Sequence, residues 1–307
     1  MGCFFIGMNV ITQNINLENS TLSLHIRRED MIHPLVSGNK YRKLKYNLEE
    51  AQKKGFKTLL TFGGAFSNHI SAVAFAGQEK GYKTIGIVRG DELKNKYTSN
   101  PTLYFANKMG MQLDFVSRDV YKNKSSEDFI EQLKVKYGDF YLLPEGGTNV
   151  LAIKGCEEIL TEDDKQYDYI CCAIGTGGTI AGIINTSSSH QKVLGFPALK
   201  GDFLKSEIRN FATGDNWELI TDYHFGGYGK TNDELIRFIN LFYEKHKIPL
   251  DPIYTGKMMF GICNLAENGY FAKNSRILAI HTGGIQGIQG MNIKLSKQKR
   301  LKIEFDV

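Results

Sequence analysis

The sequence predicts an α/β protein with two open, twisted, mostly parallel sheets that carry helices on both faces. Two observations predict this fold class. Short apolar or β-branched runs alternate with longer helical runs along most of the 307-residue chain. Several strand-like runs, such as residues 168–174, are apolar without alternation, which is typical of parallel strands covered on both faces. The length allows about two domains with a sizeable core.

The first half of the chain predicts one regular α/β unit. We expect strands over residues 58–62, 84–88, 112–116 and 140–143. We expect helices over residues 42–54, 68–80, 101–110 and 126–137, with glycines such as Gly55 and Gly81 at their ends. Before this unit, residues 9–26 predict one or two short strands, and residues 27–37 a loop.

The second half predicts a larger unit. We expect strands over residues 168–174, 193–196 and 277–281. We expect helices over residues 150–160, 179–187, 202–212, 231–247 and 256–268. Residues 294–302 are basic and predict a solvated surface segment. The expected domains are therefore residues 42–150, the smaller, and residues 1–41 with 151–307, the larger, on which the N-terminal strands pack.

Composition limits the class of protein and its partners. Apolar residues make up 42% and charged residues 23%, as in an ordinary globular protein. The net charge is +5, and the basic residues are not clustered into a stripe of the kind that binds nucleic acid. A mild positive balance can attract an anionic substrate. The odd number of cysteines, without metal-ligand spacing, predicts core thiols such as Cys171 and Cys172, no metal site and a reducing cytoplasm. No membrane span or signal peptide is expected, and translation is expected to start at Met1 or Met8.

The stretch from Ser37 to Leu44 centres on Lys40. This lysine follows a Gly-Asn turn and precedes an apolar-periodic run, so it is expected where a loop becomes a helix. The helix dipole and the neighbouring Arg42 and Lys43 discourage its amine from holding a proton. A neutral amine is what forms a Schiff base with an aldehyde cofactor. Most lysines in such a place are only solvated, so this interpretation depends on the accompanying motifs.

Gly175, Thr176, Gly177, Gly178 and Thr179, here called the phosphate cup, lie between an expected strand and an expected helix. Glycines let backbone N–H groups approach an anion, the helix start favours negative charge, and threonine hydroxyls donate. A dinucleotide fingerprint is the alternative. It needs an acidic residue at the end of the next strand, which is absent at Phe196-Pro197. A single phosphate fits better, and a tight turn without a ligand is the remaining alternative.

The stretch from Gly63 to His69 also follows an expected strand and opens a helix. Ser67 and Asn68 can cap that helix, and a helix start can also bind a carboxylate. His69 is a substrate contact, a proton carrier or an ordinary polar helix residue.

These stretches, together with residues 251–257, resemble the pyridoxal-phosphate enzymes of the tryptophan-synthase-β fold type. They are most similar to the branch holding D-cysteine desulfhydrase and 1-aminocyclopropane-1-carboxylate deaminase. The resemblance covers residues 28–281. It implies pyridoxal 5′-phosphate as the cofactor, Lys40 as its anchor, an active site between the domains and a homodimer.

The resemblance also implies roles for individual residues. Asn68 would bond the phenolate oxygen of the cofactor, and Ser67 would lie at the substrate carboxylate or α-carbon. His69 stands where the cyclopropane deaminases often have glutamine. Tyr254 would lie at the cofactor ring. Tyr228, in a Tyr-Gly context, would be an acid/base or positioning group, although an ordinary surface turn is the alternative there.

Two departures from the cyclopropane deaminases concern the cofactor ring. Thr255 stands where they carry glutamate, near the pyridine nitrogen, and Thr282 stands where they tend to have leucine. A hydroxyl at the ring nitrogen makes a weaker electron sink than a carboxylate does. The resemblance therefore favours β-elimination over opening of a cyclopropane ring.

The expected enzyme is a lyase or deaminase that converts a small amino acid, above all D-cysteine, to pyruvate, ammonia and hydrogen sulfide. Lys40, or a neighbour such as Tyr228, would remove the α-proton. The first alternative is the cyclopropane deaminase, which releases 2-oxobutyrate and ammonia. A non-catalytic metabolite-binding α/β protein is an alternative from another class, and a racemase or dehydratase on the same fold is a third.

Overall fold

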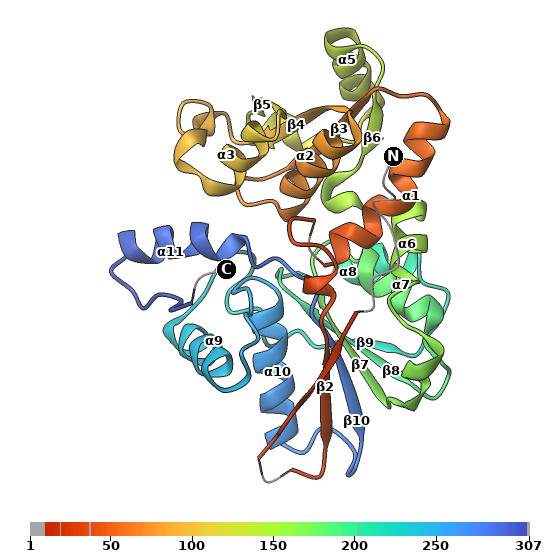
Figure 1. Cartoon of the computed structure of the whole chain (residues 1–307), viewed down its shortest axis with the longest axis vertical. Helices are drawn as coiled ribbons and strands as arrows, with labels where there is room; N and C mark the ends of the chain where they lie inside the picture. The colour runs from red at the N-terminus through yellow and green to blue at the C-terminus, as the bar shows by residue number, and fades with distance from the viewer. Residues whose placement is uncertain (1–9, 19, 37, 202, 306–307) are drawn as a thin grey trace.

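The computed structural model describes residues 10–18, 20–36, 38–201 and 203–305. Three expectations fall outside these residues: the choice between Met1 and Met8, the loop end at Ser37 and the helix start at Asp202. Two sheets flanked by helices stand one above the other in Figure 1, which confirms the predicted α/β class.

The larger sheet combines strands from both ends of the chain. In the described residues its spatial order is β1 (Thr12–Ile15), β2 (Ser23–Arg27), β10 (Arg276–Ile280), β7 (Tyr169–Ile174), β8 (Lys192–Pro197) and β9 (Trp217–Leu219). Only β1 and β2 pair antiparallel among these neighbours. Because β2 pairs with β10, the N-terminal strands join the later unit, as predicted. β9 is not predicted, because three residues are too few for a periodic pattern.

The smaller sheet is parallel throughout its described strands. Its spatial order is β5 (Gln112–Val116), β4 (Lys83–Arg89), β3 (Thr58–Gly63) and β6 (Tyr141–Leu143). All four match predicted strands to within about a residue at each end. Ligands bind beyond the carboxyl ends of parallel strands, so the ends of β3 and β4 are where a site is expected.

Helices connect the strands and cover the sheets. They are α1 (Asn39–Lys53), α2 (Asn68–Lys80), α3 (Pro101–Lys108), α4 (Arg118–Lys122), α5 (Glu127–Tyr137), α6 (Val150–Cys156), α7 (Gly178–Thr186), α8 (Phe203–Arg209), α9 (Asp233–His246), α10 (Thr255–Glu267) and α11 (Gly287–Lys297). Short 3₁₀ turns occur at Glu29–Met31, Asp91–Leu93, Tyr97–Ser99, Glu145–Gly147 and Glu162–Gln166.

Each sheet is packed on both faces, which explains its continuously apolar strands. Leu44 of α1 belongs to the core on one face of the smaller sheet, and Leu133 of α5 to the core on the other. On the larger sheet, Ile239 of α9 lies in one core and Ile180 of α7 in the opposite one. The boundaries of the two domains, residues 42–150 and the remainder, stay a prediction.

The prediction of a solvated tail over residues 294–302 is wrong for its first part. Residues 294–297 continue α11, where Leu295 is fully buried in the core of the larger sheet. The Nζ of Lys294 donates to the carbonyl of Gly229 at 2.8 Å. The many lysines of this segment make it look solvated in the sequence. Its single apolar face is recognised only in the tertiary structure, where it packs against the core of the larger sheet.

Cys171 and Cys172 are free, buried thiols in the two cores of the larger sheet, as predicted. In the described part of the chain, none of the helices has the length and apolar character needed to span a membrane.

Candidate active site

A cavity of about 580 Å³ lies at the carboxyl ends of strands from both sheets. The end of β3 contributes Gly64, β4 contributes Arg89, β7 contributes Ile174, and the turn after β10 contributes Thr282. The predicted site residues that line it are Lys40, Ser67, Asn68, His69, Gly175, Thr176, Gly177, Gly178, Thr179, Tyr228, Tyr254 and Thr282. The fold thus brings together motifs that lie far apart in the sequence.

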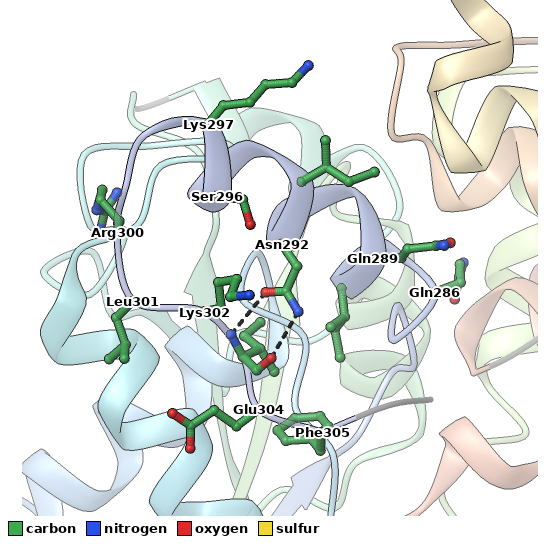
Figure 2. A pocket seen from close by; sticks show the side chains of 13 residues that line it. Gln286, Gln289, Asn292, Ser296, Lys297, Arg300, Leu301, Lys302, Glu304 and Phe305 are labelled. Carbon is green, nitrogen blue, oxygen red and sulfur yellow. Dashed lines mark hydrogen bonds between the residues drawn. The ribbon is translucent and has the colours of Figure 1, made fainter.

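A larger hollow of about 1280 Å³ lies elsewhere, between α11 and residues 300–305 (Figure 2). None of the predicted site residues lines it. Asn292 hydrogen-bonds both the N–H and the C=O of Ile303, at 2.9 Å each, so these polar groups satisfy one another. The smaller cavity, where the sequence motifs converge, is therefore the candidate active site.

Lys40 lies in the first turn of α1, where the sequence predicts it. Its Nζ donates to Asn39 Oδ1 at 3.0 Å, and Asn39 Nδ2 donates to Thr179 Oγ1 at 2.7 Å, which ties the amine to the phosphate cup. Burial lowers the pKa of Lys40 to about 7, and the positive charge of Lys43 adds to this. The prediction that Arg42 also lowers the pKa of Lys40 is wrong, because the Arg42 guanidinium is paired with the carboxylate of Glu29 at 2.9 Å.

Gly38 allows the start of α1 to lie directly against the turn after β10. Its φ is +63°, and a Cβ atom there would lie 2.0 Å from the carbonyl oxygen of Thr282. Only glycine permits both the left-handed conformation and this close approach. The N–H of Asn39 donates to the same oxygen at 3.2 Å, which joins the start of α1 to the turn after β10.

The phosphate cup opens α7, and Lys43 stands beside it. The Lys43 side chain is almost fully buried and donates to Gly146 O at 3.0 Å and Thr148 Oγ1 at 2.9 Å. Thr176 Oγ1 of the cup is 3.5 Å away. Burial lowers the pKa of Lys43, and none of these partners is a carboxylate. An anion in the cup would therefore meet backbone amides, hydroxyls and a lysine that forms no ion pair with any carboxylate among the described residues.

Lys43 is a residue of the site that is not among the predicted site residues, although its spacing from Lys40 carries a signal. Residues three apart lie on the same face of a helix, so Lys40 and Lys43 necessarily point the same way from α1. By itself, however, this spacing predicts only a positive charge near Lys40.

The start of α2 contributes a cap and an unsatisfied histidine. Ser67 Oγ accepts the N–H of Ile70 at 3.2 Å, so the predicted cap is present. His69 is 1% exposed, and neither of its ring nitrogens has a hydrogen-bond partner among the described residues. Burial, helped by the charges of Lys40 and Lys43, holds the pKa of His69 well below its usual value. The ring is therefore neutral at pH 7 and ready to hydrogen-bond a ligand.

The turn before α10 positions Tyr254. The buried carboxylate of Asp251 accepts the N–H groups of Ile253, Tyr254 and Thr255 at 2.8–3.0 Å. These bonds hold the Tyr254 ring against the phosphate cup, where a Cβ atom on Gly175 would lie 3.2 Å from its edge. Burial raises the pKa of Tyr254 well above its usual value, so the phenol stays protonated.

Thr255 does not line the cavity. It is fully buried, and its hydroxyl donates to Asp251 Oδ1 at 2.8 Å and accepts the Asp251 N–H at 3.0 Å. Thr282 does line the cavity. The sequence could not distinguish them, because each threonine lies at a junction with no periodic signal: Thr255 between a turn and a helix, and Thr282 between strand β10 and two glycines.

Tyr228 reaches the cavity from a loop with an unusual backbone. Phe225, Gly226, Gly227 and Gly229 have φ values of 52°, 86°, 110° and 65°. The buried Lys257 holds this loop, because its Nζ donates to the carbonyls of residues 224 and 227 at 2.8 and 2.9 Å. The rings of Tyr228 and Tyr254 lie edge to face with centroids 6.1 Å apart. Tyr228 is 41% exposed, and desolvation by the residues that surround its hydroxyl raises its pKa, so it suits a proton donor better than a base.

Comparison with known proteins identifies the family. A family model described as pyridoxal-phosphate dependent enzyme matches residues 12–283. This chain is a pyridoxal-phosphate-dependent enzyme. Family membership excludes the alternative of a non-catalytic binding protein, and the cofactor is the one that the motifs predict.

Two curated relatives and one solved structure show the same relationship. The enzyme is 30% identical to the bifunctional D-cysteine desulfhydrase/1-aminocyclopropane-1-carboxylate deaminase of Arabidopsis thaliana, over 89% of this chain and 74% of that protein. It is 25% identical to the D-cysteine desulfhydrase of Serratia proteamaculans, over 85% and 86%. A crystal structure of an ACC deaminase homologue superposes with a TM-score of 0.83 at 29% identity, over 95% and 94% of the two chains.

The residues of the cavity fit this cofactor. Lys40 supplies an amine that is half neutral at pH 7, and the cup with Lys43 supplies a site for a phosphate. The two unpartnered nitrogens of His69 are polar atoms that a bound molecule can satisfy. The role of each residue stays a prediction.

Proposed function

We propose that this enzyme eliminates the β-substituent of a small amino acid, with D-cysteine as substrate and pyruvate, ammonia and hydrogen sulfide as products. One observation carries the proposal. A half-neutral Lys40, a phosphate cup reinforced by Lys43, and the N-terminus of α2 all face one cavity. Because a C–S bond is broken by elimination and not by water, the activity is that of a lyase.

Each group then has a separate task. The phosphate cup and Lys43 would hold the cofactor phosphate, and Lys40 would anchor its aldehyde carbon and later take the α-proton of the substrate. When bound, pyridoxal phosphate withdraws electrons from the α-carbon of the amino acid. The start of α2, with Ser67 and Asn68, would bind the substrate carboxylate, since a helix N-terminus favours an anion.

The tyrosines and the histidine complete the reaction. The neutral His69 would donate or accept a hydrogen bond to the substrate, because its lowered pKa makes it a poor proton carrier at pH 7. Tyr228 and Tyr254, both protonated, would donate to the departing thiolate, and Asn68 would bond the phenolate oxygen of the cofactor.

Thr282 supports elimination over cyclopropane opening. We propose that Thr282, which lines the cavity, hydrogen-bonds the pyridine nitrogen, in place of the predicted Thr255, whose hydroxyl is held by Asp251. A neutral hydroxyl at this nitrogen gives a weaker electron sink than a carboxylate. Elimination of a thiolate, which leaves readily, demands less electron withdrawal by the cofactor than cleavage of a carbon–carbon bond does.

Cyclopropane deamination is the second candidate, since the Arabidopsis relative carries both activities in its name. A substrate panel separates the candidates: D- and L-cysteine, D- and L-serine, 3-chloroalanine and the cyclopropane amino acid, assayed for keto acid. We expect pyruvate from D-cysteine at a higher kcat/KM than 2-oxobutyrate from the cyclopropane amino acid. The reverse order would refute the proposed substrate.

Lys40 is tested by borohydride reduction of the holoprotein followed by digestion. The pyridoxyl mass is expected on the Lys40 peptide, and Lys40→Ala is expected to lose turnover. Lys53→Ala, an exposed lysine on the same helix, serves as the matched control. A pyridoxyl group on any other lysine would contradict the assignment.

We also propose that the enzyme is a homodimer and works in the cytoplasm. The resemblance to the enzyme family supports the dimer. The buried free thiols Cys171 and Cys172 support a reducing compartment. Light scattering on the purified holoenzyme tests the dimer, and fractionation of the native cells tests the location.

A further inference from the structure

The side-chain amide of Asn39 joins two groups of the site, one through each of its ends. Asn39 is the first residue of α1 and lines the cavity. Its Oδ1 accepts a hydrogen bond from Lys40 Nζ at 3.0 Å, and its Nδ2 donates one to Thr179 Oγ1 at 2.7 Å. Its backbone N–H donates to the carbonyl of Thr282 at 3.2 Å, which anchors the residue itself. Asn39 therefore links the position of the amine to that of the phosphate cup.

The chemistry of the two partners determines which way this amide faces. A protonated lysine amine has three donors and no acceptor, so it must face the amide oxygen of Asn39. The amide nitrogen then faces Thr179, and the hydroxyl oxygen of Thr179 accepts the bond. Because a hydroxyl carries a single hydrogen, the hydrogen of Thr179 remains available to donate to another group.

Two acceptors compete for the hydrogen of the Thr179 hydroxyl. One is the buried thiol of Cys156 on α6, whose pKa is raised by burial while the nearby Thr179 hydroxyl acts in the opposite direction. The other is an anion in the phosphate cup, of which Thr179 is a member. Sulfur is a weak acceptor, and a charged oxygen is a strong one. An anion in the cup would therefore receive this hydrogen, and the hydrogen bonds would run in one direction from Lys40 to the anion.

We propose that Asn39 is a positioning residue that holds the Lys40 amine and at the same time directs the Thr179 hydroxyl toward the cofactor phosphate. The inference rests on the proposed function, in which Lys40 anchors the cofactor, and adds a residue that serves both ends of it. An amide suits this place because it offers an acceptor to the amine and a donor to the hydroxyl. A carboxylate would accept from both neighbours and would draw the Thr179 hydrogen away from the phosphate.

The experiment uses the full-length apoenzyme and the variants Asn39→Asp, Asn39→Leu, Thr179→Val and Asn39→Leu/Thr179→Val. Gln52→Leu is the matched control, because Gln52 is an exposed amide on the same helix. Fluorescence titrations give the affinities for pyridoxal phosphate and for pyridoxal, and their ratio measures what the phosphate contributes to binding. The rate of pyridoxal capture as a function of pH gives the midpoint at which the Lys40 amine loses its proton.

The affinity ratio tests the action of Asn39 on Thr179. Thr179→Val should lower the ratio about tenfold or more, since a hydrogen bond to a charged group is lost, and Asn39→Leu should lower it about threefold or more. The double variant should lose no more than about twofold beyond Thr179→Val, because Asn39 acts through that hydroxyl. Gln52→Leu should match the wild type. Losses that multiply in the double variant, or an unchanged ratio in Asn39→Leu, would overturn the inference.

The capture midpoint tests the contact with Lys40. All of these variants keep the charged and titratable groups that act on this amine, which are Lys43, Cys156, Cys172, Asp251 and His69. Asn39→Asp places a carboxylate beside the amine, so the midpoint should rise by about 1–3 pH units. Asn39→Leu removes an acceptor that favours the charged amine, so its midpoint should not rise. An unchanged midpoint in Asn39→Asp would overturn the inference. An equal rise in Asn39→Leu would also overturn it, because that substitution would then merely open the cavity to water.

Failure of the proposed function is distinguishable from failure of this inference. It appears as wild-type holoenzyme that releases no keto acid from D-cysteine or 3-chloroalanine. The affinity ratio and the capture midpoint do not depend on turnover, so they still decide the role of Asn39 in that case.

Discussion

The pKa of Lys40 yields the sharpest prediction. Its pKa is lowered to about 7, so about half of the amines are neutral at pH 7. An ordinary lysine with a pKa of 10.5 would be roughly 0.03% neutral at that pH, so the cavity raises the reactive fraction roughly a thousandfold. Burial is the larger cause and the charge of Lys43 the second. Replacing Lys43 by methionine should therefore raise the pKa of Lys40 without restoring 10.5.

The assay is capture of pyridoxal by the apoenzyme, followed by absorbance between pH 5 and 11. Pyridoxal lacks the phosphate, so the loss of the proposed contact between Lys43 and the phosphate does not interfere. The wild-type rate should rise with a midpoint near pH 7, and that of Lys43→Met with a midpoint between 7 and 10.5. Lys53→Met, an exposed change on the same helix, should leave the midpoint where it is.

A wild-type midpoint near 10 would refute the claim that the cavity desolvates Lys40. An unchanged or lower midpoint in Lys43→Met would refute the coupling between the two lysines.

The lowered pKa of Lys40 also makes the stability of the apoenzyme depend on pH. Between pH 7 and 10.5 the unfolded chain binds a proton that folded Lys40 has lost, so the free energy of unfolding of the apoenzyme should rise with pH across this window.

Three further predictions use neighbouring contacts. Lys43→Met should weaken binding of pyridoxal phosphate by about 10- to 100-fold, because a charge-assisted hydrogen bond contributes about 1.5–3 kcal/mol. The effect on binding of pyridoxal should be much smaller. A fluorescence titration measures both affinities. Lys257→Met should lower the free energy of unfolding by about 2 kcal/mol in urea, since two loop carbonyls lose their donor, and equal urea midpoints would contradict it. Gly38→Ala should cost more than about 2 kcal/mol and reduce cofactor occupancy, because its Cβ would meet the Thr282 carbonyl in a left-handed conformation; full occupancy with unchanged stability would refute this.

Local pattern was enough for most of the elements and for the chemistry of the motifs. The strands of the smaller sheet, the turn into α1 and the cup before α7 each carry a short-range signal: a buried strand, a cap or a run of glycines. The identity of the cofactor followed from the resemblance of four such motifs. Failures occurred where an element is very short, as in β9, or where its charged face dominates the composition, as in α11.

Relations between distant residues needed the tertiary structure. That Lys43 joins the cup, that Thr282 lines the cavity while Thr255 does not, and that Arg89 stands at its rim all depend on how α1, β4 and β10 meet. A sequence determines which groups can donate, accept or ionise, because that chemistry is local. Which of these groups are buried, paired or facing one cavity is decided by packing between segments far apart in the chain, and burial is what moves the pKa of Lys40.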